Sequence, residues 1–426
     1  MTLRVLHTSD WHLGRSLYGH KRYEEFDCML DWMVSTIETE LIDVLLIAGD
    51  IFDTTTPSNR AMQQYYDFLR RVSATQCQHI VIIGGNHDSP TFLNAPRQLL
   101  QALNVHVVGA ALDDPAEEVL LLRDSQQQPM MIVCAVPYLR DRDIRQSEAG
   151  ESMADKEQKL LSGIALHYQQ VVAAAETLRA EPGSTETSVK KSETGIDVPI
   201  IGMGHLFTAG AQTVEDDGVR DLYVGSLAHV GPDIFPSSLD YVALGHLHVP
   251  QAVGGNTYIR YSGSPLPMGF GEATQQKSVC LLEFRGREPQ LKLLPVPVFQ
   301  RLRQCRGDLE TLQDALRDVA ELPGDTWVEL VYTSQRRQPE LREKLESFAA
   351  DIGAGRLTVL RIKHPQAVQR ALSQSDDEQT LDELTPEDVF ERCLSQHEVP
   401  MDEREELRSL YSEIVNDMQT ADRRAE

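Results

Sequence analysis

The chain has 426 residues, of which 41% are hydrophobic and 25% are charged, and its formal net charge is −25. These values are typical of globular proteins, and they exclude a fibrous or wholly disordered chain. The length is sufficient for two or three domains. Residues 371–426 hold 17 Asp or Glu against 5 Lys or Arg, a net of −12. The overall charge argues against a nucleic-acid substrate, but the local field around a site governs which substrate approaches it.

The sequence lacks the signals of membrane insertion and of secretion. No stretch reaches the roughly 20 consecutive apolar residues of a membrane span. The N-terminal residues 1–7 do not combine a basic segment with an apolar one and a cleavage site. The six cysteines lie far apart in the sequence, which is typical of free thiols in a reducing compartment. We therefore expect a cytoplasmic protein with no membrane partner.

The first hundred residues alternate between apolar runs and helical patterns. Runs rich in Val, Ile and Leu at 3–9, 43–49 and 79–85 have the length of buried strands, and helical periodicity lies between them at 23–39 and 58–73. Such alternation predicts an α/β fold with a parallel sheet covered by helices. Further strands are predicted at 105–108, 118–122, 130–135, 198–203, 221–225, 240–245, 257–262 and 277–284, and a long helix at 155–179.

Three parts are predicted along the chain. The first domain spans 1–288 and contains a polar, aperiodic stretch at 181–197 that is typical of a mobile surface loop. A small α+β domain follows over 289–370. A helical hairpin lies within 380–420, after a polar linker, and has an apolar face with an acidic back. We interpret this face as a partner-binding segment, although packing on its own domain is the alternative. The elements predicted in the small domain are helices at 308–320 and 338–350 and strands at 326–333 and 356–362.

Potential metal ligands follow several of the predicted strands. Because ligands gather beyond the carboxyl ends of strands in open α/β sheets, side chains distant in the sequence can meet there. Each short motif alone is a weak signal, but five in order favour a common metal site. The five segments are Ser9-Asp10-Trp11-His12, Gly49-Asp50, Gly85-Asn86-His87-Asp88, Gly204-His205 and Gly245-His246-Leu247-His248.

The types of donor indicate the kind of metal. Carboxylate, amide and imidazole groups without a thiolate suit Mn²⁺, Fe²⁺ or Zn²⁺ better than Ca²⁺. The carboxylate of Asp50 can bridge two ions held about 3.5–4 Å apart, the arrangement of many phosphoesterases. We interpret Asp53 and Asp88 as supporting or turn carboxylates rather than ligands. His7, in the first predicted strand, is the least certain of the remaining histidines.

The order of these motifs resembles that of the calcineurin-like metallophosphoesterases over roughly residues 1–285. Longer strings, such as His7-Thr8-Ser9-Asp10-Trp11-His12-Leu13-Gly14 and Tyr261-Ser262-Gly263-Ser264-Pro265, resemble the SbcD family of bacterial double-strand-break repair nucleases. The resemblance implies a four-layer α/β/β/α metallophosphoesterase sandwich. A small α+β capping domain and a C-terminal helical hairpin would follow it.

The resemblance also implies a site with two Mn²⁺ ions, or Mg²⁺ or Fe²⁺ as substitutes. His87 would not be a ligand, but would protonate the leaving oxygen or stabilise the transition state. Asp53 stands where some relatives carry a histidine, so any role of that histidine does not transfer. One ion would be held by Asp10, His12, Asp50 and His248, and the other by Asp50, Asn86, His205 and His246.

The function implied is that of a Mn²⁺-dependent DNA nuclease, with exonuclease activity on double-stranded ends and endonuclease activity on single strands or hairpins. Such nucleases act in DNA repair, recombination and replication. The implied partners are DNA and an SbcC-type coiled-coil ATPase, with two copies of this chain in a two-by-two assembly. The sequence contains no phosphate-binding loop, so we expect no nucleotide to be bound by this chain. The alternatives are another phosphoester substrate and an inactive scaffold, and the scaffold is disfavoured because every expected ligand is present.

Overall fold

The structure is a computed structural model in which the chain divides into two compact units, Met1–Gln300 and Arg301–Glu426. The predicted loop at 181–197 and the predicted strand at 221–225 lie outside the described residues, as does most of the predicted hairpin within 380–420. The structure describes residues 2–144, 151–180, 198–208, 230–334, 340–353 and 355–365, together with Phe390, Arg404, Leu407, Arg408 and Tyr411.

The first unit contains two six-stranded sheets. In the first sheet, in the order β14-β13-β1-β4-β5-β6, the last four strands are parallel to one another. Strand β13 is antiparallel to β1, and β14 is antiparallel to β13. Its strands are β1 (Leu3–Thr8), β4 (Val44–Ala48), β5 (His79–Ile83), β6 (Val105–Val108), β13 (Ser278–Arg285) and β14 (Glu288–Pro295).

The second sheet has the order β11-β12-β10-β9-β8-β7, with four parallel strands between two antiparallel edge strands. Its strands are β7 (Val119–Arg123), β8 (Pro129–Ala135), β9 (Ile200–His205), β10 (Tyr241–Gly245), β11 (Gln251–Val253) and β12 (Asn256–Tyr261). The helices of the unit are α1 (Tyr23–Thr39), α2 (Asn59–Val72), α3 (Pro90–Asn94), α4 (Arg97–Gln101), α5 (Asp141–Ile144) and α6 (Met153–Ala180). Short elements complete it: β2 (Ser16–Leu17), β3 (His20–Lys21) and the 3₁₀ helices η1 (Pro115–Glu118), η2 (Pro232–Ile234) and η3 (Phe270–Glu272).

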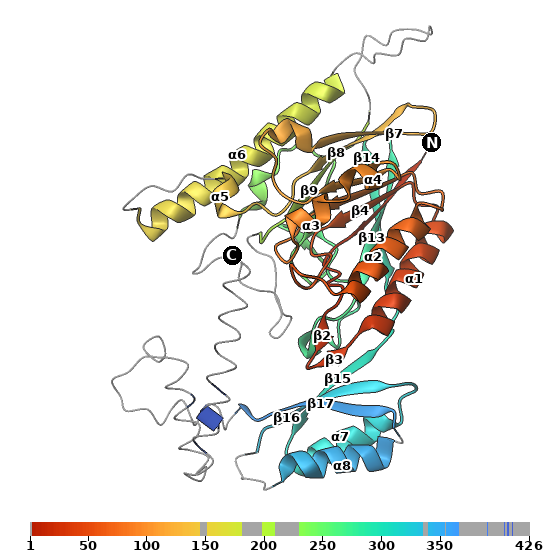
Figure 1. The fold of residues 1–426 in the computed structure, drawn as a ribbon, viewed down its shortest axis with the longest axis vertical. Helices are drawn as coiled ribbons and strands as arrows, with labels where there is room; N and C mark the ends of the chain where they lie inside the picture. Colours follow the sequence, from red (N-terminus) through yellow and green to blue (C-terminus); the bar gives the residue numbers. More distant parts are fainter. Residues whose placement is uncertain are drawn as a thin grey trace. The chain divides into compact units, whose positions relative to one another are not determined.

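The two sheets pack face to face, and helices cover their outer faces (Figure 1). Successive side chains of β4 point to opposite faces. Leu45 therefore lies in the hydrophobic cluster that includes α1 and α2, whereas Leu46 lies in a cluster with Met203 of the second sheet. On the far side, Val171 of α6 packs in a cluster with Ile132 of β8. The predicted four-layer α/β/β/α sandwich is confirmed.

The second unit has a three-stranded parallel sheet with two helices that share its core. Its elements are β15 (Arg301–Gly307), α7 (Leu309–Ala320), β16 (Thr326–Tyr332), α8 (Leu341–Gly353) and β17 (Leu357–Lys363). The two units divide at Gln300, and β14 pairs with β13 along its whole length, so this strand belongs to the first unit. The sequence analysis missed β14 because most of this edge strand is exposed and lacks an apolar run.

Two further observations concern the described part of the chain. None of its helices is both long enough and apolar enough to cross a membrane. Its cysteines are all free thiols, and four of the five are buried: Cys77, Cys134, Cys280 and Cys305, with Cys28 exposed.

Candidate metal centre

The loops that follow β1 and β4 run side by side and carry strained backbone. Asp10 N–H donates to the carbonyl of Gly49, and His12 N–H donates to that of Asp50, both at 3.0 Å. Asp10, His12 and Asp50 have φ angles of 54°, 49° and 50°, and His246 after β10 has 101°. Such conformations are rare for residues with a side chain, and they cluster at functional sites where surrounding contacts hold them.

Glycines allow the strand ends to approach one another closely. A Cβ atom on Gly245, at the end of β10, would lie 1.8 Å from the carbonyl oxygen of Ala48 in the other sheet. A Cβ atom on Gly85 would lie 2.2 Å from Asp50 Oδ1. Any larger residue would push the loops apart, so the glycines of these motifs bring the two sheets together at one edge.

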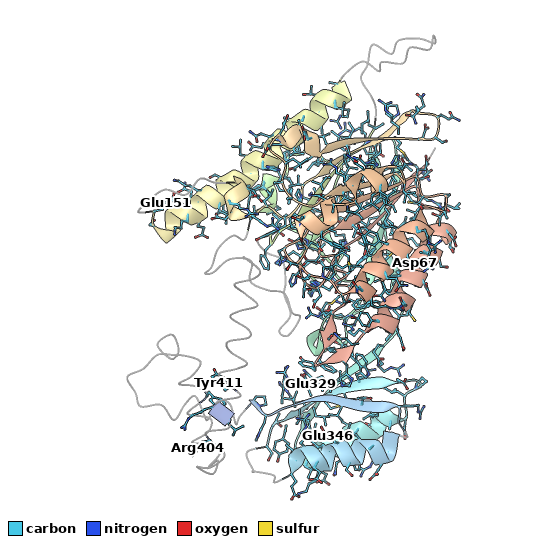
Figure 2. The ribbon with its side chains drawn as sticks, viewed as in Figure 1. Asp67, Glu151, Glu329, Glu346, Arg404 and Tyr411 are labelled. Carbon is cyan, nitrogen blue, oxygen red and sulfur yellow. The ribbon has the colours of Figure 1, made fainter. Side chains whose placement is uncertain are left out.

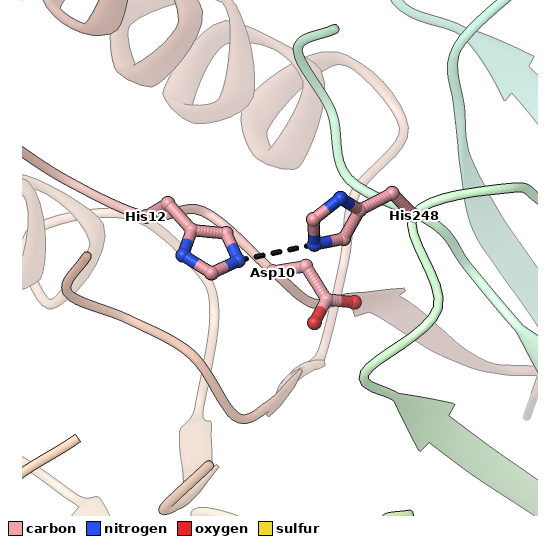
Figure 3. Close-up of side chains that lie close together, drawn as sticks. All are labelled: Asp10, His12 and His248. Carbon is pink, nitrogen blue, oxygen red and sulfur yellow. Dashed lines mark hydrogen bonds between the residues drawn. The ribbon is translucent and has the colours of Figure 1, made fainter. Parts of the chain in front are cut away.

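A first cluster of potential metal ligands consists of Asp10, His12 and His248 (Figure 3). The Nε2 atoms of the two histidines lie 3.1 Å apart. Asp10 Oδ1 accepts a hydrogen bond of 2.8 Å from the backbone N–H of His246, and Oδ2 accepts one of 2.5 Å from Ser9 Oγ. All three members are buried, so their donor atoms are turned toward each other rather than toward solvent.

A second cluster consists of Asp50, His205 and His246. The amide oxygen of Asn86 joins it, at 3.0 Å from His205 Nε2 and 3.3 Å from His246 Nδ1. His205 donates its Nδ1–H to the carbonyl of Ala48 at 2.9 Å, which leaves the lone pair of Nε2 available to a metal.

The carboxylate of Asp50 lies between the two clusters. Its Oδ2 atom is 3.3 Å from His205 Nε2 in the second cluster and 3.7 Å from His12 Nε2 in the first. Its Oδ1 atom accepts a hydrogen bond of 2.9 Å from the backbone N–H of His87. The seven residues expected as ligands, which come from five separate strand ends, are thus brought together around one carboxylate.

The electrostatics of the clusters favour bound cations. Burial opposes ionisation of Asp50, but His205 holds the pKa of its carboxyl well below the usual range. Burial also works against a charged His205 ring, yet the Asp50 carboxylate raises the pKa of His205 to about 9. A buried carboxylate needs a positive partner. A divalent cation would take the place of the proton in this pair.

The two facing histidines of the first cluster provide a direct test of whether a metal fits. The Nδ1 edges of His12 and His248 each face a carboxylate at 3.4 Å, Asp53 and Glu272 respectively. This arrangement favours a proton on each Nδ1 and leaves a lone pair on each Nε2. Two lone pairs 3.1 Å apart repel each other unless a proton or a cation lies between them. Burial lowers the pKa of His12 to about 4, so its ring is in the neutral form that ligates metals.

His87 lies next to the first cluster without belonging to it. Its ring centroid is 4.8 Å from that of His12, and its Nδ1–H donates to the carbonyl of Asp53 at 2.8 Å. The Asp53 carboxylate also pairs with Arg15 at 3.0 Å, and it forms a third group of potential donors with His12 and His87. The Nδ1 atom of His87 is therefore engaged by the backbone of the loop that carries Asp53.

Asp88 and His7 lie near the centre but contact other parts of the protein. Asp88 accepts hydrogen bonds from three backbone N–H groups, those of Gly85, Ile51 and Phe52, so it fixes the turn after β5. Burial and the nearby Asp50 raise the pKa of Asp88 to about 6. His7 is buried, and its Nδ1 lies 3.0 Å from the hydroxyl of Tyr241, outside both clusters.

The sequence analysis missed Glu272 and Lys277, which support the first cluster. Glu272 is fully buried beside His248 and forms an ion pair of 2.5 Å with Lys277. These residues lie in a polar stretch between β12 and β13 and belong to no recognised motif. In the sequence they look like the many acids and lysines of an exposed loop.

Comparisons with known proteins agree with this geometry. The family model "Calcineurin-like phosphoesterase" matches residues 3–127, and the model "Type 5 capsule protein repressor C-terminal domain" matches residues 298–398. A solved dimetal phosphatase from Danio rerio aligns with 68% of this chain and 98% of its own at 12% identity. Its TM-score of 0.34 is too low to support an argument.

Curated relatives match from two thirds of the chain to nearly the whole of it. The SbcD component of the SbcCD nuclease of Escherichia coli K12 is 35% identical over 97% of this chain and 98% of its own. The protein of the same description from Rhodobacter capsulatus is 32% identical over 91% of this chain and 93% of its own. The one from Bacillus subtilis is 33% identical over 67% of each. The chain therefore belongs to the SbcD family of calcineurin-like phosphoesterases.

Proposed function

We propose that this chain is a DNA nuclease subunit that depends on two Mn²⁺ ions, with Mg²⁺ or Fe²⁺ as substitutes. Asp50 would be the ligand shared by both ions. The first ion would be held by Asp10, His12, Asp50 and His248, and the second by Asp50, Asn86, His205 and His246. The observation that carries the proposal is the position of the Asp50 carboxylate, with Oδ2 within 3.7 Å of a histidine nitrogen from each cluster.

The ligands and His87 would have different roles in phosphodiester hydrolysis. Two divalent ions, when bound, activate water and neutralise the charge that develops on the phosphoryl oxygens. His87 would act as the general acid through a proton on Nε2, carried in addition to the Nδ1 proton that is donated to the carbonyl of Asp53, and this Nε2 proton would pass to the leaving sugar oxygen. The side chains of both clusters are buried, and charges interact more strongly in such surroundings than in water.

The extent of the similarity supports a DNA substrate. Relatives named as a component of a nuclease match 97% and 91% of this chain, which includes most of the second unit. We infer exonuclease activity on double-stranded ends and endonuclease activity on single strands and hairpins, in DNA repair, recombination and replication. The second unit favours a macromolecular substrate over a small phosphoester.

We infer that an SbcC-type coiled-coil ATPase is the partner, in a cytoplasmic assembly of two copies of each chain. The relatives are named as one component of the SbcCD nuclease, which supports the presence of a second component. The apolar face predicted within 380–420 would bind this partner. The α+β domain, predicted over 289–370, would cap the nuclease domain and help to position the duplex.

A DNA digestion assay tests the proposed function. Linear duplex, single-stranded and hairpin DNA are incubated with the purified chain and Mn²⁺, with and without the partner ATPase and ATP. We expect cleavage of all three substrates, stimulation by the ATPase, and loss of that stimulation in a chain that lacks 380–420. Asp10→Ala should abolish cleavage because it removes a member of the first cluster.

The matched control is Asp67→Asn, an exposed carboxylate on α2 (Figure 2) that should leave cleavage unchanged. Hydrolysis of a small diester such as bis-nitrophenyl phosphate without cleavage of DNA, even with the partner ATPase present, would favour the alternative substrate class. Cleavage by Asp10→Ala at the wild-type rate would refute the assigned centre.

A further inference from the structure

The loop between β12 and β13, residues 262–277, contacts His248 through a buried carboxylate. Glu272 Oε1 lies 3.4 Å from His248 Nδ1, and Glu272 is completely buried. The ring of His248 thus turns its Nδ1 edge to Glu272 and its Nε2 edge to His12, 3.1 Å away. A partner on one ring nitrogen of a metal-binding histidine fixes both the proton and the orientation of the ring.

The carboxylate of Glu272 is itself held through its Oε2 atom. Its Oε2 atom accepts a hydrogen bond of 2.9 Å from the backbone N–H of Met268 and lies 2.5 Å from Lys277 Nζ. With Oε2 occupied in this way, Oε1 is the oxygen that faces His248. The orientation of the carboxylate is therefore set before any metal binds.

Lys277 connects the carboxylate to the backbone of the same histidine. Its buried ammonium donates to the carbonyl of His248 at 2.9 Å and to Ser264 Oγ at 3.2 Å. A buried charge without a partner is costly, whereas a charge that is paired and hydrogen-bonded is tolerated. Lys277 thus neutralises Glu272 and fixes the main chain that carries the histidine ring.

The same loop also supports Asp10, the carboxylate of the first cluster. Ser262 Oγ lies 2.8 Å from Ser9 Oγ, which donates to Asp10 Oδ2 at 2.5 Å. In the second cluster, His205 is oriented by the carbonyl of Ala48 in β4. These contacts of the β12–β13 loop therefore support the first cluster. The ring of His205, in the second cluster, is held by β4 instead.

We propose that Glu272 and Lys277 are positioning residues that set how tightly the first of the two ions is held, while the second ion depends on other contacts. The inference rests on the proposed two-ion centre. The β12–β13 loop would thus support the ion held by Asp10, His12 and His248. The two ions should therefore respond differently to a change in Glu272.

Counting and titrating the metal in Glu272→Gln tests this inference without an activity assay. Wild-type protein, freed of metal and titrated with Mn²⁺, should bind two equivalents. In Glu272→Gln the affinity for one equivalent should fall about 10- to 100-fold, the usual effect of removing the partner of a metal-binding histidine. After desalting, elemental analysis should find about one Mn²⁺ per chain in the variant.

Glu118→Gln is a closely matched control. Glu118 is also a fully buried carboxylate of the first unit, and it lies 2.9 Å from the ring nitrogen of His167, away from both clusters. This variant carries the same chemical change in another buried carboxylate–histidine pair. It should keep both Mn²⁺ equivalents with their wild-type affinities, so a general loss of stability is distinguished from a loss of positioning.

A second variant keeps the inference testable if Glu272→Gln folds poorly. The double substitution Glu272→Gln with Lys277→Met removes both buried charges together, which proteins commonly tolerate. It should fold and still lose affinity for one ion. Two equivalents at wild-type affinity in a folded Glu272 variant, or an equal loss of both ions, would overturn the inference. Failure of wild-type protein with two bound Mn²⁺ to cut DNA would instead refute the proposed function.

Discussion

The two carboxylate oxygens of Asp50 have different neighbours. Oδ2 faces one histidine of each cluster, and Oδ1 accepts a hydrogen bond from the backbone N–H of His87. We expect Asp50→Asn to weaken the binding of both ions, because it removes the charge that they share. The affinity for each should fall by at least about 100-fold, the upper end of what the loss of a supporting residue costs. Titration of metal-free protein with Mn²⁺ measures this.

Asp67→Asn, which changes an exposed carboxylate of α2, is the control for that measurement. It should bind both ions as the wild type does. Selective loss of a single ion in Asp50→Asn would contradict a shared ligand and assign Asp50 to one cluster alone.

His87 should matter for turnover and not for metal content. We expect His87→Gln to retain two Mn²⁺ per chain while kcat on DNA falls about 10²- to 10⁴-fold, the usual contribution of a general acid. The physical reason is that glutamine has no group that can supply a proton to the leaving oxygen. Metal analysis and single-turnover kinetics on the same preparation separate the two effects.

His106→Gln, a change in a half-buried histidine of β6, is the control for turnover and should leave kcat unchanged. If His87→Gln lost an equivalent of metal instead, His87 would have to be reassigned as a ligand. His87, His12 and Asp53 lie close enough together to hold a metal ion, so the metal content of His87→Gln distinguishes a ligand from a general acid.

At the scale of elements, β14 should behave as part of the first unit. Leu294 is 7% exposed and lies in the cluster with α1 and α2, whereas its neighbour Leu293 is 43% exposed. Leu294→Ala should lower the free energy of unfolding by about 2–5 kcal/mol because it leaves a cavity. Leu293→Ala should change it by less than about 0.5 kcal/mol. Urea unfolding followed by tryptophan fluorescence measures both.

Equal effects of the two leucine variants would mean that β14 does not pack on the first unit. The comparison also tests the boundary at Gln300. An exposed edge strand has the composition of a loop, so its pairing with β13 is visible only when its neighbour is known.

At the scale of the whole molecule, metal should stabilise one unit and not the other. Free Mn²⁺ at about 100 times its dissociation constant adds about 2.7 kcal/mol per site to the stability of the unit that binds it. We therefore expect EDTA to lower the unfolding temperature of the first unit only. Differential scanning calorimetry, with and without Mn²⁺, should resolve one transition that shifts and one that does not.

A shift of both transitions would show that the units unfold together, and the absence of any shift would contradict a metal centre in the first unit. Leu294→Ala provides a cross-check, since the transition that it lowers should be the one that Mn²⁺ raises. Two-unit proteins commonly depart from two-state unfolding, so the transitions are assigned by these changes rather than by their order.

The sequence by itself determined many of the elements and the candidate ligands, although it did not reveal edge strands such as β14. Apolar runs such as β4 and β5 and the helical periodicity of α1 and α2 are local patterns, so their positions could be predicted to within a residue or two. The family resemblance carried by the order of the five strand-end motifs implied the four-layer fold, which the structure bears out, and nominated seven ligands.

Only the tertiary structure decided how those residues meet. Asp10 receives the backbone N–H of His246, 236 residues away, because two separate sheets end at the same edge. Glu272 and Lys277 became recognisable only through burial and through their contacts with His248. Local patterns record which residues enter a strand or a turn. The partner of a buried charge depends on long-range packing, which no short stretch of sequence contains.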